Sequence, residues 1–239
     1  MSISTELTTL STNITNAYNA IQTKGGTIPT NKNTENLETA INSISSYGNS
    51  LRDIISNRSS MTTVDFPSGI TSIGNYVFID CTNLALTSLP SGITSIGSFA
   101  FSGCRSLALT SLPSGITSIS DSAFRGCTRL ALTSLPSGIT SIDDYTFYYC
   151  YKLALTSLPN SITSIGSSAF YNCTSLTSLR IGSNIQTIAS NVFSGCTKLT
   201  TLYINLPRAT VEAMSGYSSK WGATNATIIC NDDAAWVEA

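Results

Sequence analysis

The sequence contains no histidine among its 239 residues, and only 10% of them are charged. Histidine is the commonest general base and nucleophile partner, so Ser/His and Cys/His catalytic pairs are impossible here. A formal charge of -1, without a run of Lys or Arg, offers nothing to a phosphate backbone. We therefore expect no nucleic-acid partner and no cofactor.

Long apolar runs are absent as well. No segment approaches the ~20 consecutive apolar residues that span a bilayer, and no basic start followed by an apolar block opens the chain. We expect no membrane insertion and no Sec-type signal. A virion protein or a surface protein that has lost its signal would fit this pattern equally well.

What the sequence does contain is a 23-residue repeat. The most regular positions are the phenylalanines at 78, 101, 124, 147, 170 and 193 and the cysteines at 81, 104, 127, 150, 173 and 196. Isoleucines from Ile70 to Ile185 and leucines from Leu84 to Leu199 keep the same interval. A fixed period of this length is typical of a solenoid, in which each coil packs only on its neighbours.

One unit reads LTSLPSGITSIGSFAFSGCRSLA, from Leu86 to Ala108. It predicts two extended pieces, 86–89 and 93–96, separated by a Pro-Ser-Gly turn. A helical or 3₁₀ turn through Ala100, Phe101 and Cys104 would then return the chain. About seven inward apolar side chains cannot offset the ordering of 23 residues, so a coil is stable only when stacked and capped.

Units of the form I-T-S-I-G-x-x-A-F-x-x-C-x-x-L resemble the BspA-like (Treponema-type) leucine-rich repeats over residues 61–204. The resemblance implies a right-handed solenoid of short parallel β-strands that binds host surfaces, matrix proteins or other proteins. We predict six 23-residue coils plus caps, preceded by an α-helical N-terminal segment.

Three regions follow from this pattern. Residues 1–50 are expected to be a helical attachment or oligomerisation segment. Residues 51–205 are expected to be the solenoid, with 51–62 as a polar starter cap in which Arg58 stands where cysteine belongs. Residues 206–239, which include Trp221 and Trp236, are expected to cover the final coil.

The N-terminal segment carries an apolar seam at Leu7, Leu10, Ile14, Ala17 and Ile21, with the 3-4 spacing of a coiled coil. Its many Thr, Ser and Asn residues are weak helix formers, so the helix needs a partner. Either it packs on the starter coil, or it assembles with copies of itself into a homo-oligomer.

Two segments outside the repeats resemble tail and minor structural proteins of phages of Gram-positive bacteria. They are TKGGTIPTNKNTENLETAINSI at 23–44 and WGATNATIIC at 221–230. The resemblance implies a virion component that contacts other virion tail proteins, with the solenoid facing the host. The alternative location is the extracellular space or a bacterial cell surface.

Side chains for catalysis or metal binding are sparse. The six repeat cysteines occur once per coil rather than in close pairs, so we interpret them as reduced, buried thiols rather than zinc ligands or disulfides. Asp121, Asp143 and Asp144 lie on adjacent coils, and paired acids can hydrolyse glycosides. We interpret them as solvated turn residues and predict no enzyme; a carbohydrate-active enzyme is the last-ranked alternative.

Variation among the units is concentrated between the repeat Phe and Leu positions. There the apolar core residues are the same in each unit, whereas the residues expected at the exposed rim of the solenoid differ. The central coils gather tyrosines and cations there, and both residue types are favoured in recognition surfaces. The candidate partner-binding residues are Arg125, Arg129, Tyr145, Tyr148, Tyr149, Tyr151, Lys152 and Tyr171. They predict a receptor-binding patch for a host cell-surface glycan or protein; ordinary drift on an exposed loop is the alternative.

The favoured function is therefore a non-enzymatic phage tail or tail-fibre-like protein whose solenoid binds a host surface or a partner protein. A bacterial adhesin or secreted interaction protein is the second hypothesis. The Thr-Ser pairs repeated in the first five coils allow one further, low-ranked hypothesis, ice binding, although such hydroxyls also serve to satisfy backbone groups.

Overall fold

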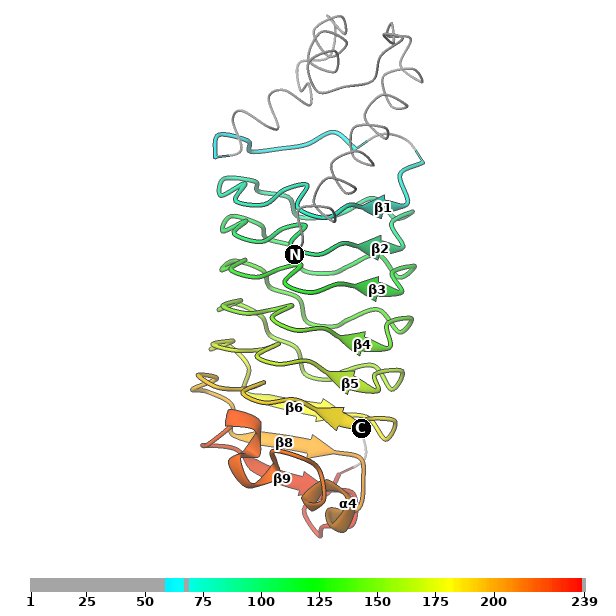
Figure 1. Cartoon of the computed structure of the whole chain (residues 1–239), viewed down its shortest axis with the longest axis vertical. Coiled ribbons are helices and arrows are strands. Elements are labelled where there is room, and N and C mark those ends of the chain that lie inside the picture. The colour runs from blue at the N-terminus through cyan, green and yellow to red at the C-terminus, as the bar shows by residue number, and fades with distance from the viewer. Residues whose placement is uncertain (1–58, 67–68, 238–239) are drawn as a thin grey trace, which may run out of the picture. The chain divides into compact units, whose positions relative to one another are not determined.

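The computed structural model describes residues 59–66 and 69–237, which belong to one compact unit, Arg58–Ala239. Successive short strands in this unit lie one above another, and the C-terminal helices lie at one end of the stack (Figure 1). The elements are the strands β1 (Ser72–Ile73), β2 (Ser95–Ile96), β3 (Ser118–Ile119), β4 (Ser141–Ile142), β5 (Ser164–Ile165), β6 (Ser178–Ile181), β7 (Thr187–Ile188), β8 (Thr201–Ile204) and β9 (Thr227–Cys230), the α-helix α4 (Arg208–Glu212) and the 3₁₀ helix η1 (Tyr217–Gly222).

Every strand pair in the described region is parallel, in the orders β1-β2-β3, β4-β5-β7 and β6-β8-β9. The register follows the sequence period, because Ser72 pairs with Ser95 and Ser164 with Thr187. The predicted parallel-strand solenoid of 23-residue coils is confirmed. The first two sheets separate between β3 and β4, at the coils that carry Asp121, Asp143 and Asp144.

The two-residue strands form at the Ser-Ile end of the Ile-Thr-Ser-Ile motif. The second isoleucine is buried in each case, while the serine before it is exposed or half-buried, which is the alternation of a one-sided strand. The threonine before them donates its hydroxyl to the preceding coil, as Thr94 Oγ1 does to the Thr71 carbonyl oxygen at 3.1 Å. These hydroxyls satisfy backbone carbonyl groups, which is the alternative to ice binding as an explanation of the repeated threonines.

The other predicted extended piece becomes a strand only in β6 and β8. There, buried Leu179 and Ile181 flank half-buried Arg180, so the period of two is kept. The earlier units instead carry two successive exposed polar residues, such as Thr110 and Ser111, followed by a leucine and then a proline. The broken alternation and the missing N–H of proline prevent a continuous ladder there.

The return segments are chains of turns and not continuous helices. The amides of Ala100, Ser102 and Cys104 bond to carbonyl oxygens three residues earlier, as in a 3₁₀ helix. The alternate amides of Phe99 and Phe101 instead donate to Asp121 and Ala123 of the next coil, at 3.0 and 2.8 Å. A helix would consume all of these amides internally, so the alternation is what joins neighbouring coils on this side.

The core is a set of side-chain ladders that run along the stack. The six repeat phenylalanines stack in sequence from Phe78 to Phe193, with ring centroids 5.2 to 5.8 Å apart and interplanar angles of 2 to 16°. Beside them the repeat cysteines are buried, and they form no disulfide with one another. Each from Cys104 to Cys196 donates its Sγ–H to the carbonyl oxygen of the phenylalanine in the preceding coil, 3.0 to 3.2 Å away.

Both described ends cover the terminal coils. Phe66 packs edge-on against Phe78 with centroids 6.1 Å apart. At the other end the chain supplies more than a cover, because β9 continues the ladder and pairs in parallel with β8. Trp221 is fully buried, and its backbone carbonyl oxygen accepts the Phe193 amide at 3.0 Å. Within the described residues, no helix has the length and apolar character needed to cross a membrane.

Candidate functional site

The five tyrosines predicted from the rim form one connected cluster, here called the tyrosine cluster. Tyr148 stands at its centre, with ring centroids 4.4 Å from Tyr149, 4.8 Å from Tyr171 and 5.6 Å from Tyr145. Tyr151 joins through Tyr149 at 5.7 Å. The stack of Tyr148 on Tyr171 is near-parallel at 19°, and the other contacts are edge-on.

Arg125 extends the tyrosine cluster by one coil. Its guanidinium carbon lies 5.3 Å from the centroid of the Tyr148 ring, a cation–π distance. Burial raises the pKa of the Tyr148 hydroxyl, with the neighbouring Tyr149 as the next cause, so Tyr148 keeps its proton at neutral pH. The cluster thus offers phenol donors and one cation on a surface of rings.

The backbone of the return segment fixes the direction of these rings. Tyr145 and Tyr149 take left-handed φ values of 54° and 61°, which bulky residues seldom adopt. Their amides are held by bonds to Ser167 and Tyr171 of the next coil, at 3.0 and 2.8 Å. The inter-coil hydrogen bonds therefore hold the ring-bearing residues in place.

The remaining predicted residues are less closely joined. Arg129 and Lys152 are exposed and make no ring contact with the tyrosine cluster in the described structure. The seam residues proposed for oligomerisation, Leu7, Leu10, Ile14 and Ile21, lie outside the described residues.

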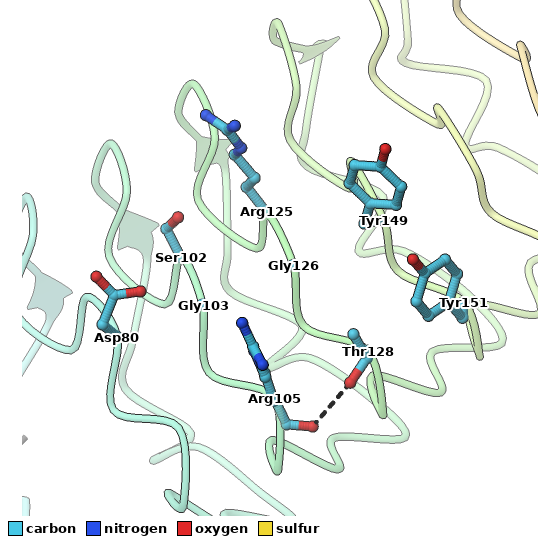
Figure 2. Close-up of a pocket in the computed structure, with 9 residues that line it drawn as sticks. All are labelled: Asp80, Ser102, Gly103, Arg105, Arg125, Gly126, Thr128, Tyr149 and Tyr151. Atoms are coloured by element: carbon cyan, nitrogen blue, oxygen red, sulfur yellow. Dashed lines mark hydrogen bonds between the residues drawn. The ribbon is translucent and has the colours of Figure 1, made fainter. Parts of the chain in front are cut away.

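Beside the tyrosine cluster lies a hollow that sequence reasoning missed, here called the glycine groove. Figure 2 shows Gly103 and Gly126 between the side chains of Arg105 and Arg125, with Asp80 at one end and Tyr149 and Tyr151 at the other. The hollow has a volume of about 730 Å³, and Ser102 and Thr128 complete its lining. A detectable signal was present: the left-handed position that holds Asp80 and Tyr149 in their own coils holds glycine in the two coils between them.

The three aspartates singled out from the sequence line a different hollow of about 440 Å³, together with Gly166 and Thr187. Burial raises the pKa of Asp121, and Asp144 and Asp143 raise it further. The Oδ1 atom of Asp121 is buried without a hydrogen-bond partner. The interpretation of all three as solvated turn residues is thus wrong for Asp121.

Thiol chemistry has little support at the repeat cysteines. Burial raises the pKa of Cys127, Cys150 and Cys173 well above the ordinary value, and it raises that of Cys196 to about 12. Thiolates are the reactive form, so these groups are inert at neutral pH. In the described part of the chain, no three His, Cys, Asp or Glu side chains are grouped to hold a metal ion.

Stacked parallel coils around leucine, isoleucine and phenylalanine ladders define a leucine-rich-repeat solenoid. The family described as "BspA type Leucine rich repeat region (6 copies)" matches residues 49–154 and 128–218. The chain belongs to this BspA-type leucine-rich repeat family. No curated protein matches the sequence significantly.

The chain is also similar to several solved structures. The leucine-rich repeat protein TpLRR of T. pallidum is 28% identical with a TM-score of 0.54, over 71% of this chain and 86% of that one. A leucine-rich cell surface protein of Faecalibacterium prausnitzii is 30% identical with a TM-score of 0.46, over 60% of this chain and 46% of that one. The pneumococcal vaccine antigen PcpA is 18% identical with a TM-score of 0.46, over 72% of this chain and 45% of that one.

Proposed function

We propose that the protein is a non-enzymatic binding protein whose solenoid recognises a surface-borne partner through the tyrosine cluster. The observation that carries the proposal is the set of contacts around Tyr148, which joins Tyr149, Tyr171 and Arg125 in one patch. Tyrosine and arginine supply large contact area at low entropic cost and dominate the energetics of many interfaces. Mutual ring contacts hold this patch ready before a partner arrives, which lowers the ordering cost of binding.

Exposure within the patch supports the same role. Tyr145 and Tyr151 are each 40% exposed, and they are among the few large apolar side chains that the described surface leaves this open. The return segment could fold with smaller residues at these places, because other coils carry Ser122 and Thr128 there. The rings are therefore not required by the fold, and partner recognition accounts for their presence.

Two settings fit such a protein. A phage tail is supported by the resemblance of residues 23–44 and 221–230 to tail proteins, with residues 1–50 attaching to other virion proteins or to copies of this chain. A bacterial cell-surface or secreted adhesin is supported by membership of the BspA-type family. Mass spectrometry of purified virions and of washed cell envelopes separates the two, since the protein would be found in one fraction only.

The binding role is tested with a triple variant that borrows residues from other coils. Tyr148→Ser, Tyr149→Asn and Tyr151→Thr insert the residues found at Ser102, Asn172 and Thr128, so the fold should accept them. We expect the labelled full chain to lose at least about tenfold in affinity for intact Gram-positive cells, about 1.4 kcal/mol.

The matched control is Tyr76→Ser, which removes the tyrosine at the position of Tyr145, three coils before the tyrosine cluster. It should leave binding unchanged, since Tyr76 stacks on Phe99 rather than on the cluster, with centroids 5.2 Å apart. If the triple variant bound as well as the unmodified chain, the tyrosine cluster would not be the recognition surface.

A further inference from the structure

We propose that the glycine groove binds an anionic carbohydrate chain, with Arg105 and Arg125 contacting its carboxylate or phosphate groups. This inference rests on the proposed function and names the ligand class for the surface beside the tyrosine cluster. Arg125 and Tyr149 belong to both surfaces, so a chain lying in the groove would also reach the rings.

The floor of the groove is open because of where glycine falls. A side chain at the left-handed position is aimed at the next coil, as Asp80 shows: its Oδ1 atom lies where a Cβ of Gly103 would be. Gly103 has no side chain to extend over Gly126, so a Cβ built on Gly126 meets only the Gly103 backbone, at 3.7 Å. Glycine at this position in two successive coils therefore leaves a gap, which side chains fill in other coils.

The charges beside this gap favour an anion. Within the described residues, no carboxylate lies within 4.0 Å of the Arg105 or Arg125 guanidinium. The ion pairs of the described residues are both made by Arg208, which does not line the groove. Planar guanidinium groups bind carboxylate and phosphate oxygens in pairs, and these two come from adjacent coils. A polymer with a negative group on each repeating unit could engage both.

The lining favours a carbohydrate over a peptide. It consists of charged groups, hydroxyls, glycine backbone and two tyrosine rings, and it includes no aliphatic side chain. A pocket that takes up an aliphatic side chain of a peptide needs an aliphatic lining, which this groove does not offer. A sugar ring can instead lie against Tyr149 or Tyr151 and bond to Ser102 and Thr128. The volume of about 730 Å³ lies within the range of ordinary ligand sites.

The test uses isothermal titration of the full chain with three probes: a polygalacturonate oligosaccharide, a purified glycerol-phosphate wall teichoic acid and neutral dextran. We expect one or both anionic probes to bind, with affinity that falls as NaCl rises from ~0.05 to ~0.5 M, and no binding of dextran. The first probe presents carboxylates and the second presents phosphates, so the comparison also identifies the anionic group.

Variants taken from other coils keep the fold intact. Arg105→Thr with Arg125→Ser copies Thr128 and Ser102, and should weaken the anionic probe about tenfold or more. Gly126→Asn copies Asn172, which has a φ of 57°. Because Tyr149 rather than glycine follows in the next coil, the introduced amide must take another rotamer than that of Asn172, and it should block the groove without removing charge. Asp80→Asn removes the one carboxylate of the lining and should strengthen binding. Lys198→Ser, an exposed cation two coils beyond Lys152, is the control and should have no effect.

Each failure has its own pattern. If neither anionic probe binds, or if the arginine pair and Gly126→Asn leave affinity unchanged, the groove is not an anionic glycan site. The tyrosine cluster could still bind cells in that case, because the triple tyrosine variant tests it separately. If cell binding depends on the tyrosines and is removed by protease treatment of the cells, the partner is a protein and the carbohydrate inference is wrong.

Discussion

The Sγ of Cys127 donates a hydrogen bond to the carbonyl oxygen of Phe101 in the preceding coil, 3.0 Å away. The same contact joins Cys104 to Phe78 and Cys196 to Phe170. The five cysteines from Cys104 to Cys196 are therefore more than small apolar residues, because each of them links two coils through a buried donor. Removing that proton would leave a thiolate facing a carbonyl oxygen inside the core.

The first prediction is a loss of stability at alkaline pH. Burial raises the folded-state pKa of Cys127 and of its equivalents above the unfolded value, so the native state holds protons that the unfolded state releases. Their stabilising contribution is complete below the unfolded pKa of about 8.5 and is lost as pH rises toward the folded pKa. The free energy of unfolding should fall by up to about 1.4 kcal/mol per pH unit for each buried thiol.

Urea denaturation between pH 7 and pH 10 measures this slope. The Cys127→Ser variant has one thiol fewer and should show a shallower dependence, whatever its stability at pH 7. Identical slopes for the two proteins would show that Cys127 does not titrate in unfolding.

The second prediction concerns the phenylalanine ladder. Phe124 is fully buried, and its ring lies between those of Phe101 and Phe147, at 5.5 and 5.8 Å. Phe124→Ala should lower the free energy of unfolding by roughly 3 to 5 kcal/mol, through lost burial and the cavity it leaves. Phe99→Ser is the matched control, because Ser122 and Ser168 hold the same rim position; its loss in urea denaturation should be clearly smaller.

The third prediction concerns Asp121. Its pKa is raised by burial and by Asp144, so its contribution to stability is present below the ordinary value of about 3.9 and is lost as pH rises through the folded value. Asp121→Ser, which copies Ser98, should therefore raise the melting temperature at pH 7. The gain should shrink as pH falls toward the ordinary value of about 3.9, because the raised pKa of Asp121 favours its protonated form in the native protein. A lower melting temperature at pH 7 would contradict this assignment.

The repeat itself made the stacking predictable. Because the spacing of 23 is unbroken for Phe and Cys, equivalent residues had to lie in rows, and the observed register of Ser72 with Ser95 follows directly. The tyrosine cluster was predictable for the same reason, since Tyr148 and Tyr171 hold one template position in adjacent coils. A fixed apolar period shows which residues lie on the same face of the solenoid, and residues on one face of adjacent coils contact each other.

Backbone details were less accessible. The first extended piece of the unit, 86–89 and its equivalents, fails as a strand in the early coils because two successive residues such as Thr110 and Ser111 both face solvent, and a count of leucines does not reveal this. The glycine groove depends on the direction of a left-handed residue, which is a three-dimensional property of Asp80 and Gly103. The 23-residue repeat did not predict β9. Its residues pair with β8 residues that lie 26 positions earlier rather than 23, as in the pairing of Thr201 with Thr227.

The contact of the Asp80 side chain with Gly103 also shows that side chains at this rim position reach toward the following coil and not the preceding one. A side chain at this position constrains the coil that follows, as Asn172 does where its Oδ1 atom fills the Cβ place of Gly195, but it leaves the preceding coil free. Where Asp80 and Asn172 reach over the next coil at this position, that coil carries glycine, so an Asp or Asn in the same rotamer elsewhere should require glycine one coil later. Grooves in such a scaffold could then be opened or closed one coil at a time while the interior stays untouched, a simple route to new binding specificities.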